Sequence, residues 1–171
     1  TADYLLHGAS VTASKTMVEQ PVETITTAID GTRNMLEFAA RCKMTGMVYL
    51  SSMEAYGTVP NGCGQVREED LGYIDVLNVR SSYPEGKRMA ECLCASYASE
   101  YGVPVKIARL AATFGAGIDP GENRVFAQFA RSVLAGEDIV LHTKGEKANC
   151  YCYTVDAVTG LLVLLLKGEQ G

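Results

Sequence analysis

A tyrosine and a lysine stand one helical turn apart in the segment "RSSYPEGKRMAE", residues 80–91. Pro84 is compatible with the first turn of a helix, and a preceding serine can cap that turn. Because residues i and i+4 share a helix face, Tyr83 and Lys87 can meet. A nearby positive charge lowers the pKa of a tyrosine and suits it to proton transfer near neutral pH. The same spacing also fits a surface helix on which the two side chains have no chemical role.

The elements around this segment predict an α/β fold, because short apolar segments alternate with helical patterns. Strands are expected at residues 4–10, 46–52, 103–115, 138–143 and 149–154, and helices at 20–43, 82–101, 125–136 and 155–167. Strands that are apolar throughout are typical of a parallel sheet covered on both faces. The chain is therefore predicted to form a single domain over residues 1–171, built on a doubly wound parallel sheet.

Ligands of such sheets bind at the carboxyl ends of the strands. Ser51 and Ser52 end the expected strand at 46–52 and are therefore expected at the ligand-binding edge. A glycine-rich phosphate loop should follow the first strand of a dinucleotide-binding sheet, and the sequence has none there. The nearest candidate, "GAGIDPG" at 115–121, has the spacing G-x-G-x-x-x-G and is interrupted by Pro120. We interpret it as an ordinary loop.

Composition limits the classes of function. The net charge of −5 argues against a nucleic-acid surface, and 47% hydrophobic residues are typical of a soluble globular protein. The N-terminus does not have the pattern of a signal peptide, and the longest apolar run, "LLVLLL" at 161–166, is too short to cross a membrane. Six cysteines without a secretory signal suggest reduced thiols and a cytoplasmic location.

Two Cys-x-Cys pairs are the only candidates for a metal site. Cys92 and Cys94 fall in a helical pattern, where side chains two residues apart point in different directions. Cys150 and Cys152 fall in an expected strand and face the same way, but no second pair follows at zinc-finger spacing. The sequence therefore predicts no metal site.

Four ordered motifs carry a resemblance to a known family. They are "SSMEAYG" (51–57), "YPEGK" (83–87), "RLAATFGAG" (109–117) and "YTVDAV" (153–158). Together they resemble the extended short-chain dehydrogenase/reductases. More narrowly, they are similar to the NAD-dependent nucleotide-sugar epimerases, dehydratases and UDP-glucuronate decarboxylases.

The resemblance assigns roles to four residues. Tyr83 would be the catalytic acid/base, and Lys87 would hold the ribose of NAD and lower the pKa of the tyrosine. Ser52 would form a hydrogen bond to the reacting oxygen of the sugar. Glu54 matches a glutamate shared by the dehydratases and decarboxylases. Met53 replaces the aspartate of the dehydratases, which favours a decarboxylase-like relative.

The same resemblance implies a nucleotide-sugar substrate, with Ser51, Ser52, Arg109 and Asn149 as binding residues. Asn149 stands where an arginine usually approaches the pyrophosphate of the substrate. Because pairing between arginine and phosphate is a strong, charge-assisted contact, this difference should weaken substrate binding.

Family members open with strand–helix units that carry a glycine-rich loop, and "DYLLHGAS" resembles their fourth strand. The chain is therefore expected to form a partial Rossmann-like fold, truncated before that strand. NAD binding is expected to be weak or absent, because the loop that receives the pyrophosphate is missing. An exposed apolar edge at residues 4–8 tends to recruit another strand. We therefore expect a homodimer or larger assembly, formed at this edge or through helices 20–43 and 82–101.

Two further hypotheses stay open. One is a cofactor-independent sugar-active enzyme such as a glycoside hydrolase, which needs two carboxylates around the bond to be cleaved. Glu54 would be one of them, with Glu85 or Asp156 as the second, although Glu85 also fits a solvated helix residue and Asp156 a helix N-cap. The other hypothesis is a fragment without catalytic activity.

Overall fold

The computed structural model of the chain describes residues 2–59, 65–141, 143–145 and 149–169. Their contacts divide the chain into two units, Thr1–Leu110 with Gly160–Gly171, and Ala111–Thr159. Each unit has its own sheet. The expected single domain over residues 1–171 stays a prediction.

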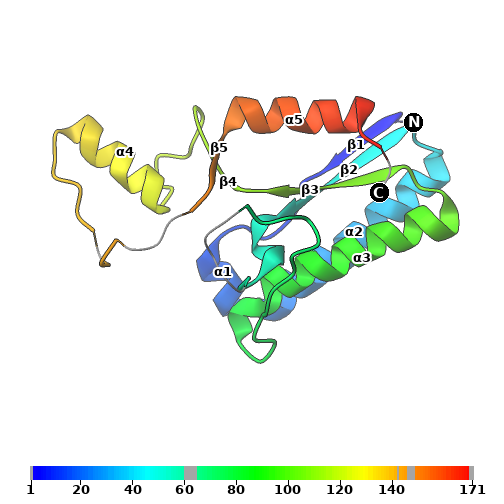
Figure 1. Cartoon of the computed structure of the whole chain (residues 1–171), viewed down its shortest axis with the longest axis horizontal. Coiled ribbons are helices and arrows are strands. Elements are labelled where there is room, and N and C mark those ends of the chain that lie inside the picture. The colour runs from blue at the N-terminus through cyan, green and yellow to red at the C-terminus, as the bar shows by residue number, and fades with distance from the viewer. Residues whose placement is uncertain (1, 60–64, 142, 146–148, 170–171) are drawn as a thin grey trace. The chain divides into compact units, whose positions relative to one another are not determined.

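A three-stranded parallel sheet lies at the centre of the first unit (Figure 1). Its strands are β1 (Tyr4–His7), β2 (Gly46–Ser52) and β3 (Val105–Leu110), in the order β1-β2-β3. Parallel neighbours in one sheet require crossover connections, and helices provide them here. The predicted class, a parallel α/β fold, is therefore confirmed.

The two crossover helices lie side by side on one face of this sheet (Figure 1). They are α2 (Pro21–Cys42) and α3 (Ser82–Tyr101). Side chains alternate between the two faces of a strand, so Met47 and Tyr49 of β2 point the same way. Both join a buried core with Leu36 of α2 and residues of α3. Burial of this apolar face is what holds the helices on the sheet.

The opposite face of the sheet meets part of α5 (Thr154–Lys167). Lys106 follows the core residue Val105 in β3, so its side chain points away from α2 and α3. Its ammonium donates a hydrogen bond to the carbonyl oxygen of Leu165 at 2.9 Å. Gly46 also lies close to Leu165, and a Cβ added there would be 3.3 Å from the Leu165 carbonyl oxygen. Helices thus contact both faces, as the sequence predicts.

The ends of the long helices follow their sequence signals. Pro21 lies in the first turn of α2, where a missing N–H has no consequence. Gly102 ends α3 with φ +66°, a left-handed conformation that glycine adopts without a Cβ clash. Both helices agree with the predicted ranges 20–43 and 82–101 to within a residue at each end.

Three short elements were not predicted. They are α1 (Ser14–Glu19) and the 3₁₀ helices η1 (Met53–Tyr56) and η2 (Val79–Ser81). Each is too short to show a helical period in the sequence. A side-chain cap accounts for η1, because the Ser52 hydroxyl accepts a hydrogen bond from the backbone N–H of Glu54 at 3.2 Å.

The second unit contains a two-stranded parallel sheet and one helix. Strand β4 (Ala112–Phe114) pairs with β5 (Tyr151–Tyr153), and α4 spans Val125–Ala135. The single strand expected at 103–115 is therefore split between the two sheets. The strand expected at 138–143 was wrong for residues 138–141, which are irregular and exposed. A strand needs a hydrogen-bonded neighbour, and none pairs with these residues in the part of the chain that the structure describes.

Replacing Leu36 with alanine tests the core described above. Leu36 is fully buried, so Leu36→Ala is expected to lower the free energy of unfolding by about 2–5 kcal/mol. Urea unfolding followed by circular dichroism measures the change. Leu77→Ala is the matched control, because Leu77 is 91% exposed and its truncation should change the free energy by less than about 0.5 kcal/mol. Equal effects of the two substitutions would contradict this core assignment.

Candidate functional site

The carboxyl end of β2 presents two serines to opposite faces of the sheet. The Ser52 hydroxyl lies close enough to the phenol of Tyr83 to lower its pKa. The Ser51 hydroxyl is buried and donates a hydrogen bond to Oε1 of Glu91 at 2.5 Å. The two neighbouring serines thus bind two different residues of α3. Only Ser52 joins the tyrosine that the sequence singles out.

Lys87 lies one turn after Tyr83 on α3 and is 3% exposed. Its Nζ donates a hydrogen bond to the carbonyl oxygen of Leu50 in β2 at 2.8 Å. The same nitrogen is 5.7 Å from the centre of the Tyr83 ring and 4.9 Å from that of Tyr49. The structure therefore brings Ser52, Tyr83 and Lys87 together, and we call them the Ser–Tyr–Lys corner.

The phenol of Tyr83 keeps its proton more firmly than an exposed tyrosine. Burial has the largest effect and raises the pKa of Tyr83, and the negative charge of Glu54 raises it further. The Ser52 hydroxyl and the positive charge of Arg80 lower it. The sequence predicted a lowered pKa, and that direction was wrong for this structure. The reason is desolvation, which penalises the phenolate and outweighs the favourable effects of Ser52 and Arg80.

Burial shifts the pKa of Lys87 in the opposite direction to that of Tyr83. Burial lowers the pKa of Lys87 to about 8, while the nearby Glu91 and Cys94 act in the opposite direction. A buried ammonium loses its hydration, so its charge depends on the groups around it. At neutral pH the residue is still an ammonium, close to the point at which it would lose its proton.

Glu54 is held by an arginine that the sequence analysis did not identify. Nη2 of Arg80 donates to both carboxylate oxygens of Glu54 at 2.9 Å. The guanidinium carbon of Arg80 lies 5.7 Å from the centre of the Tyr83 ring. Charge-assisted contacts of this kind fix the orientation of the carboxylate. Glu54 also lines a pocket of about 380 Å³, together with Ser81 and Pro84.

The two carboxylates considered as partners of Glu54 in a hydrolase are Glu85 and Asp156. Glu85 forms an ion pair with Arg88, with 3.4 Å between Oε1 and Nη1. Asp156 is an exposed residue in the first turn of α5 and belongs to the second unit. The structure therefore gives each of the three carboxylates a different setting, and the hydrolase hypothesis stays untested.

Arg88 fixes the loop that follows β2. Its Nε donates to the carbonyl oxygen of Ala55 at 2.7 Å, and its Nη2 donates to that of Gly72 at 2.7 Å. Thr58 and Tyr73 form an antiparallel bridge within the same loop. A residue of α3 thus ties both sides of the loop to the helix that carries Tyr83.

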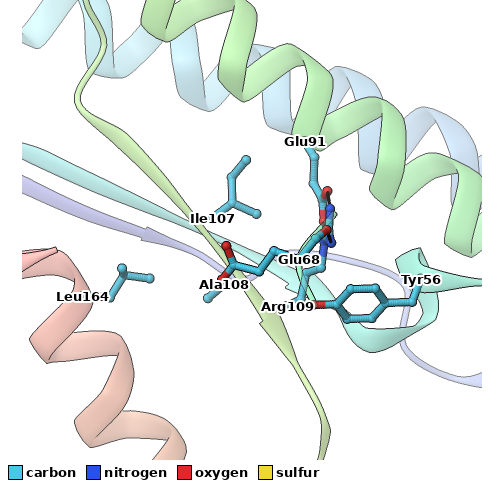
Figure 2. Close-up of a pocket in the computed structure, with 7 residues that line it drawn as sticks. All are labelled: Tyr56, Glu68, Glu91, Ile107, Ala108, Arg109 and Leu164. Carbon is cyan, nitrogen blue, oxygen red and sulfur yellow. Dashed lines mark hydrogen bonds and ion pairs between the residues drawn. The ribbon is translucent and has the colours of Figure 1, made fainter. Parts of the chain in front are cut away.

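Arg109, a predicted substrate-binding residue, is already paired within the chain. Its Nε and Nη2 donate to the two carboxylate oxygens of Glu91 at 2.9 and 2.7 Å, and its Nη1 donates to the carbonyl oxygen of Glu68 at 2.6 Å. The hydrogen bonds that Arg109 donates to Glu91 raise the pKa of Arg109, so it stays charged. The guanidinium also lies over the ring of Tyr56, 4.7 Å from its centre. Figure 2 shows these side chains together.

The Glu91–Arg109 pair lines a cavity of about 460 Å³ (Figure 2). Its other lining residues are Tyr56, Glu68, Ile107, Ala108 and Leu164. Of the four predicted substrate-binding residues, Ser51 and Arg109 therefore meet at Glu91, and Ser52 belongs to the Ser–Tyr–Lys corner. Asn149 is an exposed residue of the second unit. The substrate-binding roles of these residues stay predictions.

The whole chain matches one protein family. Residues 1–171 match the family described as NAD dependent epimerase/dehydratase family. The chain belongs to this family. The resemblance that its sequence motifs indicate is therefore confirmed at the level of the family.

Curated relatives of this epimerase/dehydratase chain are decarboxylases. UDP-glucuronic acid decarboxylase 1 of Xenopus tropicalis is 34% identical over 163 residues, which are 95% of this chain and 38% of the relative. UDP-N-acetyl-alpha-D-glucosaminuronate decarboxylase of Bacillus cytotoxicus is 32% identical over 99% of this chain and 52% of the relative. The chain thus spans about two fifths to one half of the length of these two relatives.

Solved structures show the same fold. UDP-glucose 4-epimerase of Thermotoga maritima, solved with UDP-glucose, matches with a TM-score of 0.81 and 26% identity over 97% of this chain and 52% of that chain. dTDP-glucose 4,6-dehydratase of Bacillus anthracis, solved in complex with NAD, matches with a TM-score of 0.78 and 20% identity over 98% and 49%. These matches confirm the partial Rossmann-like α/β fold.

Among the described residues, no group of three or more histidine, cysteine, aspartate or glutamate side chains has the arrangement of a metal site. Within the same residues, no helix combines the length and the apolar character needed to cross a membrane.

The lowered pKa of Lys87 predicts how stability depends on pH. The unfolded chain binds this proton with the ordinary pKa of 10.5 and the folded chain with a pKa of about 8, so the unfolded state holds more protons between these values. The free energy of unfolding contributed by Lys87 should therefore rise from about pH 8 to about pH 10. Urea unfolding of the wild type and of Lys87→Met over this range measures it, since methionine lacks the titrating group. Parallel pH profiles for the two proteins would contradict the prediction.

Proposed function

We propose that this chain carries the proton-transfer site of an NAD-dependent enzyme that decarboxylates a uronic-acid nucleotide sugar. The observation that supports it most is the setting of Tyr83, with the Ser52 hydroxyl close enough to lower the pKa of the phenol and the buried ammonium of Lys87 5.7 Å from the centre of the ring. The corner lies at the carboxyl end of β2, where ligands of parallel sheets bind. The decarboxylase relatives support a substrate of the uronic-acid type.

In this proposal Tyr83 exchanges a proton with a hydroxyl group of the sugar. Its raised pKa means that the resting phenol is protonated, so it must be helped to act as a base. Lys87 supplies a positive charge near the ring, which favours the phenolate in the moment of transfer. Ser52 holds the phenol and can also form a hydrogen bond to the reacting oxygen, which orients the sugar.

NAD, when bound, would accept a hydride from the sugar and return it. Lys87 and Tyr83 are the residues that would contact its ribose. Among the described residues, Lys87 uses one of its three N–H groups, on Leu50, and two remain for the hydroxyls of a ribose. The residues present therefore fit this part of the cofactor. The 171 residues contain no glycine-rich loop for the pyrophosphate, so we expect them to bind NAD weakly by themselves.

Glu54 supports the decarboxylase form of the proposal. In the proposed site it is an ionised residue, held by Arg80 and close enough to Tyr83 to raise the pKa of the phenol. Met53 precedes it and has no proton to donate to a leaving hydroxyl group, which disfavours a dehydratase reaction. The pair of residues therefore favours a carboxylate-assisted decarboxylation over a dehydration.

We also propose that the chain forms a homodimer or a larger assembly. Strand β1 has one hydrogen-bonded neighbour in the described sheet, and its Tyr4 and Leu6 are 46% and 44% exposed. Such an edge can pair with a second copy. The exposed sides of α2 and α3 are the other surface considered. Light scattering at micromolar protein concentration tests this, and a monomer would contradict it.

Replacing Tyr83 with phenylalanine tests the proposed function. The substitution removes the hydroxyl and keeps the ring, so turnover of UDP-glucuronic acid with added NAD should fall roughly 10²–10⁴-fold. Release of carbon dioxide measures the turnover, and saturation-transfer NMR measures binding of the nucleotide sugar, which Tyr83→Phe should keep.

Tyr101→Phe is the matched control, because Tyr101 lies on the same helix and is 59% exposed. It should behave as the wild type does. Equal turnover by Tyr83→Phe and the wild type would contradict the proposal. A wild-type chain that neither turns over nor binds UDP-glucuronic acid would contradict it as well.

A further inference from the structure

A buried carboxylate lies one helical turn beyond the catalytic lysine that we propose. Glu91 follows Lys87 at i+4 on α3, so both side chains lie on the same face of the helix. Glu91 is 9% exposed and Lys87 is 3% exposed. The pair therefore occupies the space between α3 and the sheet, where water screens its charges less than at the surface.

Glu91 is held in place from the sheet. The Ser51 hydroxyl donates to its Oε1 at 2.5 Å, and Arg109 donates to both of its oxygens at 2.9 and 2.7 Å. Figure 2 shows Glu91 reaching down from α3 to meet Arg109, which comes from β3. Two strands and one helix thus fix the position of a single carboxylate. Charge-assisted hydrogen bonds of this geometry hold the carboxylate in one orientation.

Glu91 differs in charge from the other titratable groups near Lys87. Four titratable groups besides Glu91 interact with Lys87 or lie against it, from α3, β2 and β1: Cys94, Tyr83, Tyr49 and His7. Burial raises the pKa of Cys94 to about 12 and raises the pKa of both tyrosines, so these three keep their protons. Burial lowers the pKa of His7, which is therefore a neutral imidazole. Glu91 is the negative charge in this set at neutral pH.

We propose that Glu91 is a positioning residue of the proton-transfer site, a fixed negative charge that keeps Lys87 in its ammonium form beside Tyr83. This inference rests on the proposed function, in which the ammonium of Lys87 favours the phenolate of Tyr83. Ser51 and Arg109 then act one step further away, because they hold the carboxylate. The network explains why the two serines at the end of β2 point to different partners: one holds the phenol and the other holds the counter-charge of the lysine.

Burial and Glu91 act on the pKa of Lys87 in opposite directions, so the effect of Glu91 can be measured as a change in this pKa. Burial lowers the pKa of Lys87 to about 8 even with Glu91 present. Without the negative charge the pKa should fall further, by roughly one pH unit or more, as expected for loss of a close opposite charge. About half of Lys87 or more would then be neutral at neutral pH, and Tyr83 would lose that share of the charge that favours its phenolate.

The test is an NMR titration of the full 171-residue chain carrying ¹³Cε-labelled lysine, with the Lys87 signal assigned by its loss in Lys87→Arg. Glu91→Gln keeps the shape of the side chain and removes its charge. The titration midpoint of Lys87 should move down by roughly one pH unit or more. Glu100→Gln is the matched control, because it makes the same change at an exposed position of the same helix. It should leave the midpoint in place. An unchanged midpoint in Glu91→Gln would overturn the inference.

A second variant keeps the test decisive if Glu91→Gln does not fold. Arg109→Gln removes the positive charge that faces Glu91 from the sheet. The Ser51 hydroxyl still donates to Glu91 in this variant and keeps the carboxylate in place. The carboxylate then acts on Lys87 without the opposing charge of Arg109, so the midpoint of Lys87 should move up. An unchanged or lowered midpoint would overturn the inference. Because the titration needs neither NAD nor a sugar, its outcome is independent of the turnover assay with Tyr83→Phe. Failure of one is therefore distinguishable from failure of the other.

Discussion

The contact between the Lys87 ammonium and the carbonyl oxygen of Leu50 is the constraint on which the rest of the site depends. A lysine buried to this degree is stable only if other groups replace the water that it has lost. The chain provides a carbonyl oxygen from β2, the faces of two tyrosine rings, and the charge of Glu91. Each of these groups comes from a neighbouring turn or strand, so the helix and the sheet must dock before the lysine can be buried.

The alternation of side chains along β2 distributes the chemistry between two faces. Tyr49 and Ser51 point toward the core side, where one packs in the hydrophobic cluster and the other binds Glu91. Ser52 turns the other way and meets Tyr83 while it also caps η1. A shift of the strand by one residue would exchange these positions. The register of β2 with β1 and β3 therefore fixes the site as much as the identities of the residues do.

Much of this could be predicted from sequence because the signals are local. The i, i+4 spacing places Tyr83 and Lys87 on one face, and the apolar run that ends in two serines places Ser52 at a strand end. The partners of Glu54 and Arg109 could not be predicted, because Arg80 and Glu91 are brought to them only by tertiary packing. The spacing of Glu91, four residues after Lys87, indicates only that the two side chains share a helix face. The direction of the Tyr83 pKa was wrong for the same reason, since burial cannot be read from spacing.

The attachment of Arg88 to both sides of the loop after β2 has a consequence for how such a chain can diverge. Its bonds to Ala55 and Gly72, with the bridge between Thr58 and Tyr73, close the base of a loop whose ends stay next to each other. The entropic cost of closing a loop rises slowly with its length. Insertions or replacements beyond that base would therefore leave the register of α3 unaltered. The loop can therefore vary in sequence and length while Tyr83 and Lys87 keep their positions on α3.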